Sequence, residues 1–321
     1  MVSRVVVVGS FNVDHVWACA SLPRAGETLG GRYATGPGGK GFNQATASAR
    51  AGAATSFVCA LGADAGGQLA RTLAAGDDID LRALESGEPT GTAGIYVDAD
   101  GRNCIVIGPG ANAQLTADHV AAQGDALAGA AVLLTQLESP HEAILAALQA
   151  ARAQSVLTLF NPAPANAAIS RELLALSDVL TPNESEFAGL IARHVGERID
   201  GDGIAALDQA RLHALCRELL GDGTVVVTLG ASGCFVSHAE GNLRGDERAF
   251  YRLPAEQVRA VDTTGAGDAF NGALAAALAR APAAPFAQHL RYASRYAALS
   301  TEHEGAAAAM PIDADVRQRF G

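Results

Sequence analysis

The feature that most constrains the fold of this chain is a repeated alternation between short apolar runs and longer stretches of helical period. The short runs have the length of buried strands, and the longer stretches repeat apolar residues three or four apart, as one face of a helix requires. This alternation predicts a doubly wound α/β fold, in which helices cover both faces of a mostly parallel sheet. The predicted strands are residues 5–8, 56–60, 131–134, 156–159, 178–180 and 225–229, and the predicted helices are 42–51, 66–75, 116–128, 140–152, 184–192, 205–220 and 268–280.

Two segments interrupt the alternation, at about residues 13–36 and 90–108. Both read as strand and hairpin material without a crossover helix, and both lie close in sequence to candidate ligand residues. We expect them to form a small β-sheet lid within a single α/β domain that covers residues 1–321. A lid of this kind excludes water from an active site. From the pattern alone, an ordinary hairpin extension of the main sheet is equally compatible.

Composition narrows the classes of partner. With 321 residues, of which 49% are hydrophobic, the chain can build a substantial core. The net charge of −11 argues against nucleic acid or an anionic membrane as the main partner. It does not exclude an anionic nucleotide, because backbone N–H groups and a bound metal ion can reverse the field within one pocket.

The five cysteines are scattered along the chain, odd in number and without a Cys-x-x-Cys pair. This spacing favours reduced, buried thiols over a disulfide framework or a zinc site. The N-terminal apolar run is too short for the core of a signal peptide, and no apolar run has the length of a membrane span. We therefore expect a soluble, cytoplasmic protein.

The strongest chemical signal is the sequence Asp-Thr-Thr-Gly-Ala-Gly-Asp at residues 262–268, where a predicted helix begins. The N–H groups at a helix start lack partners within the helix and attract anions, and glycines let a large anion approach the backbone. We interpret these N–H groups as holding a phosphate during its transfer, and Asp268 as the base that takes a proton from the attacking group. That interpretation suggests a kinase, although the same residues also fit an ordinary capped helix.

A second glycine-rich loop, at residues 36–45, contains Lys40, the only lysine among 23 basic residues. The loop is not a Walker loop, because a glycine follows the lysine and Ala34 holds the place of the first glycine. Two glycines before a helix permit close approach of a ligand, with Lys40 and Asn43 directed at it. Retention of a compact ammonium among arginines suggests a position that guanidinium cannot fill, with chance survival as the alternative.

Further polar loops follow the predicted strands, where ligands bind in parallel sheets. Asn12 and Asp14 follow the first strand and suit a polyhydroxylated substrate, since a carboxylate accepts from two hydroxyls and an amide both donates and accepts. Turn chemistry alone gives the same residue types. Three more such loops are residues 136–140, which place Glu138 after a buried strand, 181–186, which also fit a plain N-cap, and 228–233, which offer a hydroxyl and bare backbone to a nucleotide.

Taken together, these motifs resemble the ribokinase/pfkB family of carbohydrate kinases, over nearly the whole chain. Residues 38–45 are similar to the N-terminal signature of the family, residues 262–270 to its C-terminal signature, and residues 183–186 to its Asn-x-x-Glu motif. The segments that resemble the ribose-phosphorylating members of the family are residues 12–14, 26–28, 110–113, 136–140 and 161–165.

The resemblance implies a ribokinase-like fold with a lid, and ATP, Mg²⁺ and K⁺ as cofactors. It also implies transfer of the γ-phosphoryl group of ATP to the primary 5-hydroxyl of D-ribose, with Asp268 as base. The implied anion hole consists of Gly265, Ala266 and Gly267. The implied sugar ligands are Asn12, Asp14, Gly39, Lys40, Asn43, Glu138 and Asp268. The implied ATP ligands are Asn183, Thr228, Gly230, Ala231, Ser232, Gly233, Gly267 and Ser294, with Glu186 acting on Mg²⁺ through water.

Members of the family of this type are also activated by a monovalent cation beside the anion hole. The matching ligands here are Asp262, the carbonyl of Thr264, Ser300, His303 and Gly305. A further serine of the family's cation site falls on Ala309 in this chain.

Two alternative functions and the oligomeric state can also be considered from the sequence. A kinase for a nucleoside or another sugar is the main alternative. A nucleoside kinase needs an apolar or aromatic platform for the base, and Phe42 keeps that alternative open. A catalytically silent sugar-binding relative is disfavoured, since Asp268 and the Gly-Ala-Gly turn are intact. A lid sheet with exposed edges tends to pair with a copy of itself, so we expect a homodimer formed through the lid.

Overall fold

The computed structural model describes residues 4–321, so residues 1–3 of the expected single domain lie outside the described part. The strands are β1 (Arg4–Val8), β2 (Asn12–Cys19), β3 (Gly31–Gly38), β4 (Ala54–Gly62), β5 (Asp80–Ser86), β6 (Gly91–Val97), β7 (Asn103–Gly108), β8 (Ala130–Thr135), β9 (Leu157–Phe160), β10 (Val179–Leu180), β11 (Thr224–Thr228), β12 (Cys234–Ser237) and β13 (Phe250–Leu253). The helices are α1 (Lys40–Arg50), α2 (Ala65–Gly76), α3 (Ala117–Ala121), α4 (Gly124–Leu127), α5 (His141–Ala153), α6 (Arg171–Ala175), α7 (Glu184–His194), α8 (Gln209–Leu219), α9 (Ala266–Arg280), α10 (Phe286–Ser300) and α11 (Asp313–Phe320).

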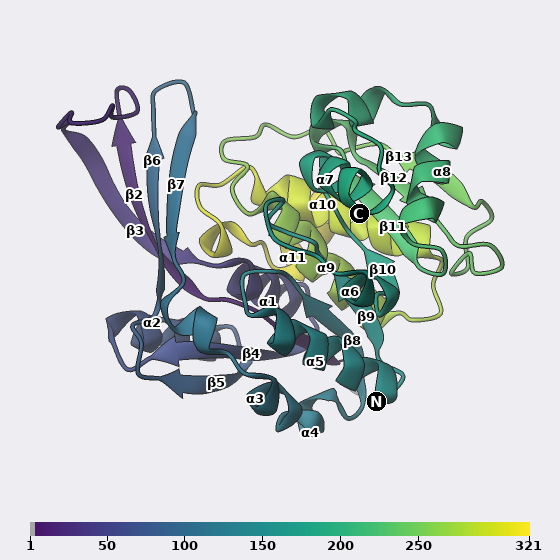
Figure 1. The fold of residues 1–321 in the computed structure, drawn as a ribbon, viewed down its shortest axis with the longest axis horizontal. Helices are drawn as coiled ribbons and strands as arrows, with labels where there is room; N and C mark the ends of the chain where they lie inside the picture. The colour runs from purple at the N-terminus through teal and green to yellow at the C-terminus, as the bar shows by residue number, and fades with distance from the viewer. Residues whose placement is uncertain (1–3) are drawn as a thin grey trace.

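The main sheet contains nine strands within residues 4–321, in the order β13-β12-β11-β10-β9-β8-β1-β4-β5 (Figure 1). The strands from β11 to β5 in this order pair in parallel, and β12 and β13 add an antiparallel edge. The carboxyl ends of the parallel strands therefore meet along one edge of the sheet. The predicted α/β class with a mostly parallel sheet is confirmed.

Helices cover both faces of this sheet, and successive strand residues point to opposite faces. In β1, Val5 and Val7 belong to a core shared with α1, α2, α9 and α10. Val6 and Val8 belong to a second core shared with α5, α7 and α8. Because both faces are buried, the strands read in the sequence as continuous apolar runs. No helix of residues 4–321 combines the length and the apolar character that crossing a bilayer requires.

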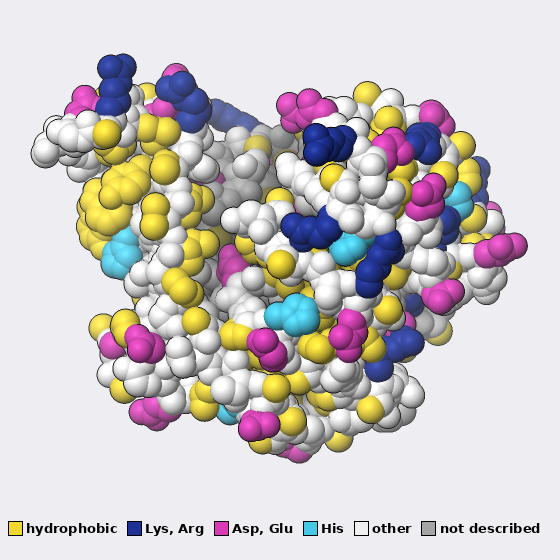
Figure 2. Space-filling model, in the orientation of Figure 1, with side chains coloured by type: hydrophobic (Ala, Val, Ile, Leu, Met, Phe, Trp, Pro, Cys, Tyr) yellow, Lys and Arg dark blue, Asp and Glu magenta, His cyan; other side chains and the backbone are white. Residues whose placement is uncertain are grey.

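A separate four-stranded sheet forms the lid, in the order β3-β2-β6-β7 (Figure 1). The predicted small β-sheet is thus present, as a sheet of its own rather than an extension of the main one. β2 pairs antiparallel with β3, from Asn12 opposite Gly38 to Cys19 opposite Gly31. The ring of Trp17 packs on Tyr33 at 5.2 Å and on Tyr96 at 5.3 Å between centroids. Figure 2 shows hydrophobic side chains gathered over the lid.

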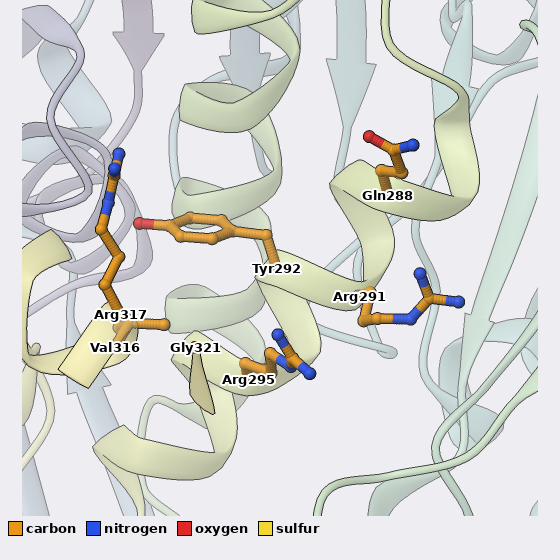
Figure 3. Close-up of a pocket in the computed structure, with 7 residues that line it drawn as sticks. All are labelled: Gln288, Arg291, Tyr292, Arg295, Val316, Arg317 and Gly321. Carbon is orange, nitrogen blue, oxygen red and sulfur yellow. The ribbon is translucent and has the colours of Figure 1, made fainter. Parts of the chain in front are cut away.

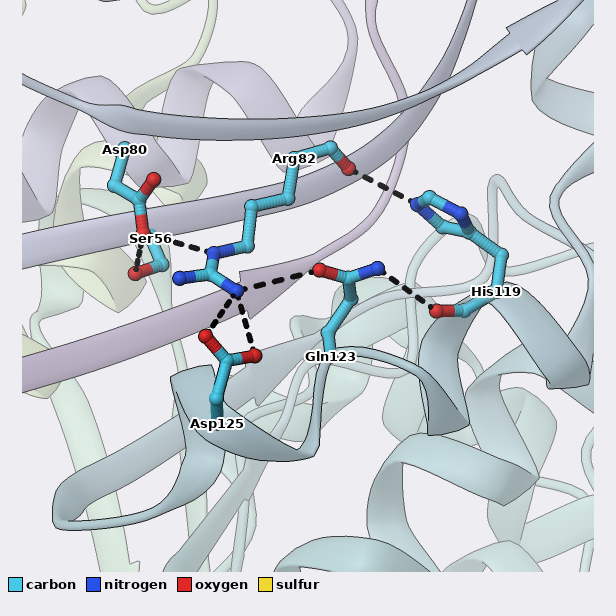
Figure 4. Close-up of polar contacts among 6 residues, drawn as sticks. All are labelled: Ser56, Asp80, Arg82, His119, Gln123 and Asp125. Carbon is cyan, nitrogen blue, oxygen red and sulfur yellow. Dashed lines mark hydrogen bonds and ion pairs between the residues drawn. The ribbon is translucent and has the colours of Figure 1, made fainter.

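Two predicted helices differ from the structure. Residues 116–128 form two short helices, α3 and α4, separated at Gln123. Arg82 of the edge strand β5 donates hydrogen bonds to Asp125 at 2.7 Å and to Gln123 at 3.4 Å, and the carbonyl of Arg82 is hydrogen-bonded to the ring of His119 (Figure 4). The break between α3 and α4 therefore lies where β5 contacts both helices. The helix predicted from residue 205 begins at Gln209, because Asp208 caps it, and a 3₁₀ turn precedes it.

Candidate active site

The start of α9 has the geometry of an anion site. Gly265 is the N-cap in the left-handed conformation, with φ of 74°, and a Cβ there would lie 2.9 Å from the Cβ of Ala306. Gly267 is exposed, and a Cβ there would meet nothing within 4 Å, so the space before the helix is open. The N–H of Ala266 donates to the carbonyl of Thr263 at 3.2 Å. The helix thus presents a bare glycine backbone at its positive end.

Asp268 lies in the first turn of α9 and is 7% exposed. Its Oδ2 accepts from Nδ2 of Asn43 at 2.9 Å, and its Oδ1 accepts from Nε2 of Gln44 at 2.9 Å. Burial raises the pKa of Asp268, while the charge of Lys40 and the two amide donors lower it. A buried carboxylate with a raised pKa is a suitable general base.

Lys40 begins α1 opposite Asp268. Burial lowers the pKa of its ammonium, but the attraction of Asp268, Glu138 and Glu186 outweighs burial and the pKa is raised. The backbone N–H of Lys40 donates to Oε2 of Glu138 at 2.9 Å, and Oγ of Ser10 donates to the same oxygen at 2.6 Å. The only lysine of the chain is therefore the cation among three carboxylates.

Asn12 and Asp14 lie where β2 leaves the main body. Oδ1 of Asn12 accepts from Nδ2 of Asn112 at 2.8 Å, and Asn112 also bonds both the N–H and the carbonyl of Phe11. Burial raises the pKa of Asp14 to about 6, with further contributions from Glu138 and Asp268. Asp14 therefore shares one electrostatic environment with the lysine loop and the start of α9.

Glycines make room for these side chains. Gly39 has φ of 86°, and a Cβ there would lie 2.8 Å from the N of Asn12. Oδ1 of Asn43 is buried and has no partner among the described residues, so it can accept a hydrogen bond from a ligand hydroxyl. The structure thus brings all the predicted sugar residues to the carboxyl edge of the sheet: Asn12, Asp14, Gly39, Lys40, Asn43, Glu138 and Asp268.

The predicted ATP residues follow β10 and β11. Asn183 and Glu186 form a capping box at the start of α7, so the N-cap reading of this motif is confirmed, although it leaves Nδ2 of Asn183 for another partner. Thr228 pairs with Asn183 in an isolated bridge between the two strand ends. After Thr228 comes a 3₁₀ turn of Gly230, Ala231 and Ser232, followed by Gly233 with φ of 85°. Ser294 lies in the middle of α10 and is half-buried.

Glu186, one of the predicted nucleotide-side residues, lies within electrostatic reach of Lys40 and Asp268. Burial raises the pKa of its carboxyl, the Asn183 N–H and the charge of Lys40 lower it, and Asp268 raises it further. Glu186 thus faces the same charged cluster as the base. An oxygen ligand of this kind, with one carboxylate oxygen held by the Asn183 N–H at 2.8 Å, fits a hydrated Mg²⁺.

The predicted cation ligands come together only in part. Oδ1 of Asp262 accepts from the N–H and the hydroxyl of Thr264, and Oδ2 accepts from the N–H of Gly305 at 2.9 Å. Ser300 is buried and donates to the carbonyl of Ala297, whereas His303 is exposed. No group of three or more His, Cys, Asp or Glu side chains in residues 4–321 is placed to hold a metal ion. The carboxylate of Asp262 thus links the turn at Thr264 to the loop at Gly305.

Two hollows lie elsewhere on the surface. One, of 220 Å³, lies between α10 and α11 and is lined by Arg291, Tyr292, Arg295 and Arg317 among others (Figure 3). The other, of 460 Å³, lies at the amino ends of β9 and β10, on the opposite edge of the sheet from Asp268. Neither is lined by a predicted site residue. We assign the active site to the carboxyl edge, because the convergent polar groups lie there.

Phe42 is buried and does not offer a platform for a base, so its side chain gives no support to the nucleoside alternative. Its side chain is 1% exposed and packs on Phe11 at 5.0 Å and on Phe57 at 5.9 Å between ring centroids. Three residues of the site were missed by sequence reasoning: Ser10, Gln44 and Asn112. Each lies within a quoted motif or beside one, but its role depends on a contact across the fold.

A buried carboxylate at an open helix start, opposite a lysine, fits a kinase that transfers a phosphoryl group to an alcohol. The chain belongs to the pfkB family of carbohydrate kinases, whose model matches residues 2–313. It is 37% identical to a ribokinase from Mus musculus over 317 residues, which covers 98% of this chain and 94% of the relative.

Solved structures agree with this assignment. The fold matches a ribokinase from Giardia lamblia with a TM-score of 0.87 and 28% identity, over 100% of this chain and 99% of the other. It also matches an Arabidopsis thaliana ribokinase complexed with ribose and ATP, with a TM-score of 0.82 and 30% identity, over 99% and 98% of the two chains. The predicted family and the predicted ribokinase-like fold with a lid are confirmed.

Proposed function

We propose that this chain is an ATP-dependent kinase that transfers the γ-phosphoryl group of ATP to the primary 5-hydroxyl of D-ribose, giving ribose 5-phosphate and ADP. The observation that carries the proposal is the position of Asp268. Its buried carboxylate lies at the open start of α9, next to Asn43, whose free oxygen can receive a sugar hydroxyl. The relatives named ribokinase, and the Arabidopsis structure with ribose and ATP, support the same substrates.

In the proposed reaction, Asp268 accepts the proton of the 5-hydroxyl as its oxygen attacks the γ-phosphorus. The bond from that phosphorus to the bridging oxygen of ADP breaks, and ADP leaves with the bond electrons. The N–H groups of Gly265, Ala266 and Gly267 stabilise the charge on the transferring group, with the Ala266 N–H released from Thr263. The sugar is held by Asn12, Asp14, Gly39, Lys40, Asn43 and Glu138.

The proposed nucleotide site lies at the ends of β10 and β11, further along the sheet from β1. Asn183, Thr228, the turn of Gly230, Ala231, Ser232 and Gly233, and Ser294 of α10 would hold ATP, with Gly267 shared between the two sides. Mg²⁺, near Glu186, would neutralise charge on the phosphates. K⁺ at Asp262, with the carbonyl of Thr264 and with Ser300, His303 and Gly305, would fix the turn before α9.

We also propose a homodimer formed through the lid. The edge strand β7 is exposed at every residue, and it carries three consecutive large apolar side chains: Ile105 at 49%, Val106 at 66% and Ile107 at 46% exposure. A long apolar edge of this kind is an unpaired template for another strand. A second copy of the chain, which brings the same edge, would cover it. The buried thiols of Cys59, Cys216 and Cys234 suit a reducing compartment such as the cytoplasm.

One experiment tests the substrate and the base together. ADP release is measured with pentoses, hexoses and nucleosides, in K⁺ or in Na⁺, for the wild type and for Asp268→Asn. We expect the highest kcat/KM for D-ribose, and a loss of about 10²- to 10⁴-fold in kcat for the variant. Turnover of a nucleoside without turnover of ribose would overturn the substrate, and near-normal kcat in Asp268→Asn would overturn the base.

A further inference from the structure

Buried amide side chains form a hydrogen-bonded network that ends at the carboxylate of Asp268. Nε2 of Gln44 donates to Oδ1 of Asp268 at 2.9 Å and to Oδ1 of Asn161 at 3.1 Å. Nε2 of Gln136 donates to Oε1 of Gln44 at 2.5 Å. Gln44 and Gln136 are fully buried, and Asn161 is 6% exposed. The two donors of the Gln44 amide are therefore both used, and its oxygen is used as well.

The backbone fixes the direction of this chain of hydrogen bonds. Nδ2 of Asn161 donates to the carbonyl of Thr181 at 2.9 Å, so Asn161 must present its oxygen toward Gln44. Gln44 must then direct its NH₂ group at Asn161 and Asp268, and its oxygen at Gln136. Only one orientation of the Gln44 amide satisfies all these partners, whereas Oε1 of the buried Gln136, at the end of the network, has no partner among the described residues.

A second branch from the same strand end holds the anion hole. Oγ1 of Thr181 donates to Oδ1 of Asn271 at 2.5 Å, and Nδ2 of Asn271 donates to the carbonyl of Gly267 at 2.8 Å. Asn271 and Thr181 are both buried. Thr181, the residue after β10, is therefore linked to two adjacent residues in the first turn of α9. It reaches Gly267 through Asn271, and it reaches Asp268 through Asn161 and Gln44.

Asn43 and Gln44 differ in what they can do for the base. Both donate to Asp268, at 2.9 Å each. Oδ1 of Asn43 has no partner among the described residues, so this amide can turn toward a ligand. Every polar atom of Gln44 is bound within the protein, so Gln44 is the group that ties the carboxylate to the frame of the sheet.

We propose that Gln44 is a positioning residue for phosphoryl transfer, whose amide sets the rotation of the Asp268 carboxylate relative to the anion hole and favours its ionised form. This inference rests on the proposed kinase function. Hydrogen bonds to a carboxylate favour the charged form, and a base must point at the proton that it takes. Gln44 acts through Asp268 and does not touch the sugar.

The test is the variant Gln44→Met, which keeps the length of the side chain and removes the amide. We expect kcat for the phosphorylated sugar to fall by roughly 10- to 100-fold, while KM for ATP changes little. We expect the acidic limb of the kcat–pH profile to move to higher pH by about 1 unit, because the carboxylate loses one donor. A purely structural role would lower Tm and leave this limb in place.

Thr46→Val is the matched control. Thr46 lies on the same helix, is 1% exposed, and has a hydroxyl without a partner among the described residues. This variant removes a buried polar group two residues away without removing a bond to Asp268. We expect its pH profile to match that of the wild type. If Thr46→Val moves the acidic limb as far as Gln44→Met does, the effect is a general one of α1 and the inference is overturned.

If Gln44→Met fails to fold, Gln136→Met gives the decisive measurement. It leaves the bond from Gln44 to Asp268 and frees the Gln44 oxygen, so we expect a smaller shift of the acidic limb in the same direction. An unchanged limb in whichever variant folds overturns the inference. Failure of the proposed function is separate, because it would appear as a lack of sugar-dependent ADP release by the wild type.

Discussion

Gly38 lies directly against the carboxylate of Asp14. A Cβ at position 38 would lie 2.2 Å from Oδ2 and 2.3 Å from Oδ1 of Asp14, across the pairing of β3 with β2. No side chain fits at that distance, so the rotamer of Asp14 depends on the absence of one at position 38. The sugar site is therefore shaped by a residue that contributes no functional group.

Gly38→Ala should raise KM for the sugar by about 10-fold or more, since Asp14 must leave its position. Gly36→Ala is the control, because a Cβ at position 36 of the same strand would meet nothing within 4 Å. Steady-state kinetics with varied sugar measures both. Equal KM values for the two variants would contradict the role of the close contact.

Sugar binding should weaken as the pH falls through about 6, where Asp14 takes up a proton and can no longer accept from two hydroxyls. The pKa of Asp14 in the folded protein lies above its ordinary value of 3.8, so between those two pH values the folded protein holds a proton that the unfolded chain has lost. This group therefore lowers stability as the pH rises through that window. Asp14→Asn should remove this pH dependence from both KM and Tm. Both quantities are measured from about pH 4.5 to about pH 8, a range that brackets the pKa of Asp14 at about 6.

Lys40→Met should move the acidic limb of the kcat–pH profile upward, because the charge of Lys40 lowers the pKa of Asp268. Lys40→Arg keeps the charge and should keep the limb. It should nonetheless raise KM for the sugar, since a planar guanidinium does not replace a compact ammonium. Profiles of kcat against pH for both variants check this. A shifted limb in Lys40→Arg would show that charge is not the cause.

Asp262→Asn should abolish the difference between rates in K⁺ and in Na⁺. Hydrogen bonds from Thr264 and Gly305 outweigh burial and lower the pKa of Asp262, so it is a carboxylate at neutral pH. An amide at this position offers a cation a weaker oxygen. The measurement is kcat against the concentration of each salt, with Cl⁻ held constant. A variant that keeps full selectivity for K⁺ would place the cation elsewhere.

Val106→Glu should convert the proposed dimer to a monomer, because a charge in the middle of the edge strand β7 opposes strand pairing. Ile312→Glu is the control, since Ile312 is 51% exposed and lies outside the lid. Sedimentation velocity at micromolar protein measures the mass of each. A wild type that sediments as a monomer would remove the proposed dimer.

The sequence was sufficient for β1, β4, β8, β9, β10 and β11, because buried parallel strands read as apolar runs, and ligands bind where such strands end. It did not indicate β5, an edge strand of the same sheet in which no residue is fully buried. It did not indicate α10, whose buried face includes the polar or amphipathic residues His289, Tyr296 and Ser300 beside Phe286, Leu290 and Ala293. β12 and β13 are four residues each and gave no distinct period. Boundaries in these regions depend on packing that periodicity does not express.

Within the site, residue types and spacing indicated which groups could meet a ligand, but not which groups would orient them. Gln44 and Asn112 bond to residues more than 90 positions away in the chain. Phe42 shows the same limit, because the sequence left open whether this aromatic in a ligand motif is accessible, and in the fold it fills the core beneath the motif. Side-chain direction at a loop is a property of the whole fold.

The lid joins the main body beside the proposed sugar site, since β2 begins at Asn12 and β3 ends at Gly38, next to Gly39. A strand of eight residues is about 26 Å long, so a rotation of the lid by a few degrees about its first residue would displace its far end by ångströms. The lid contains two cysteines, Cys19 in β2 and Cys104 in β7, and the thiol of Cys104 is exposed. Because β7 is also the edge that we propose to pair with a second copy, a label at Cys104 in a Cys19→Ser variant should report the approach of two lids as a change in its emission.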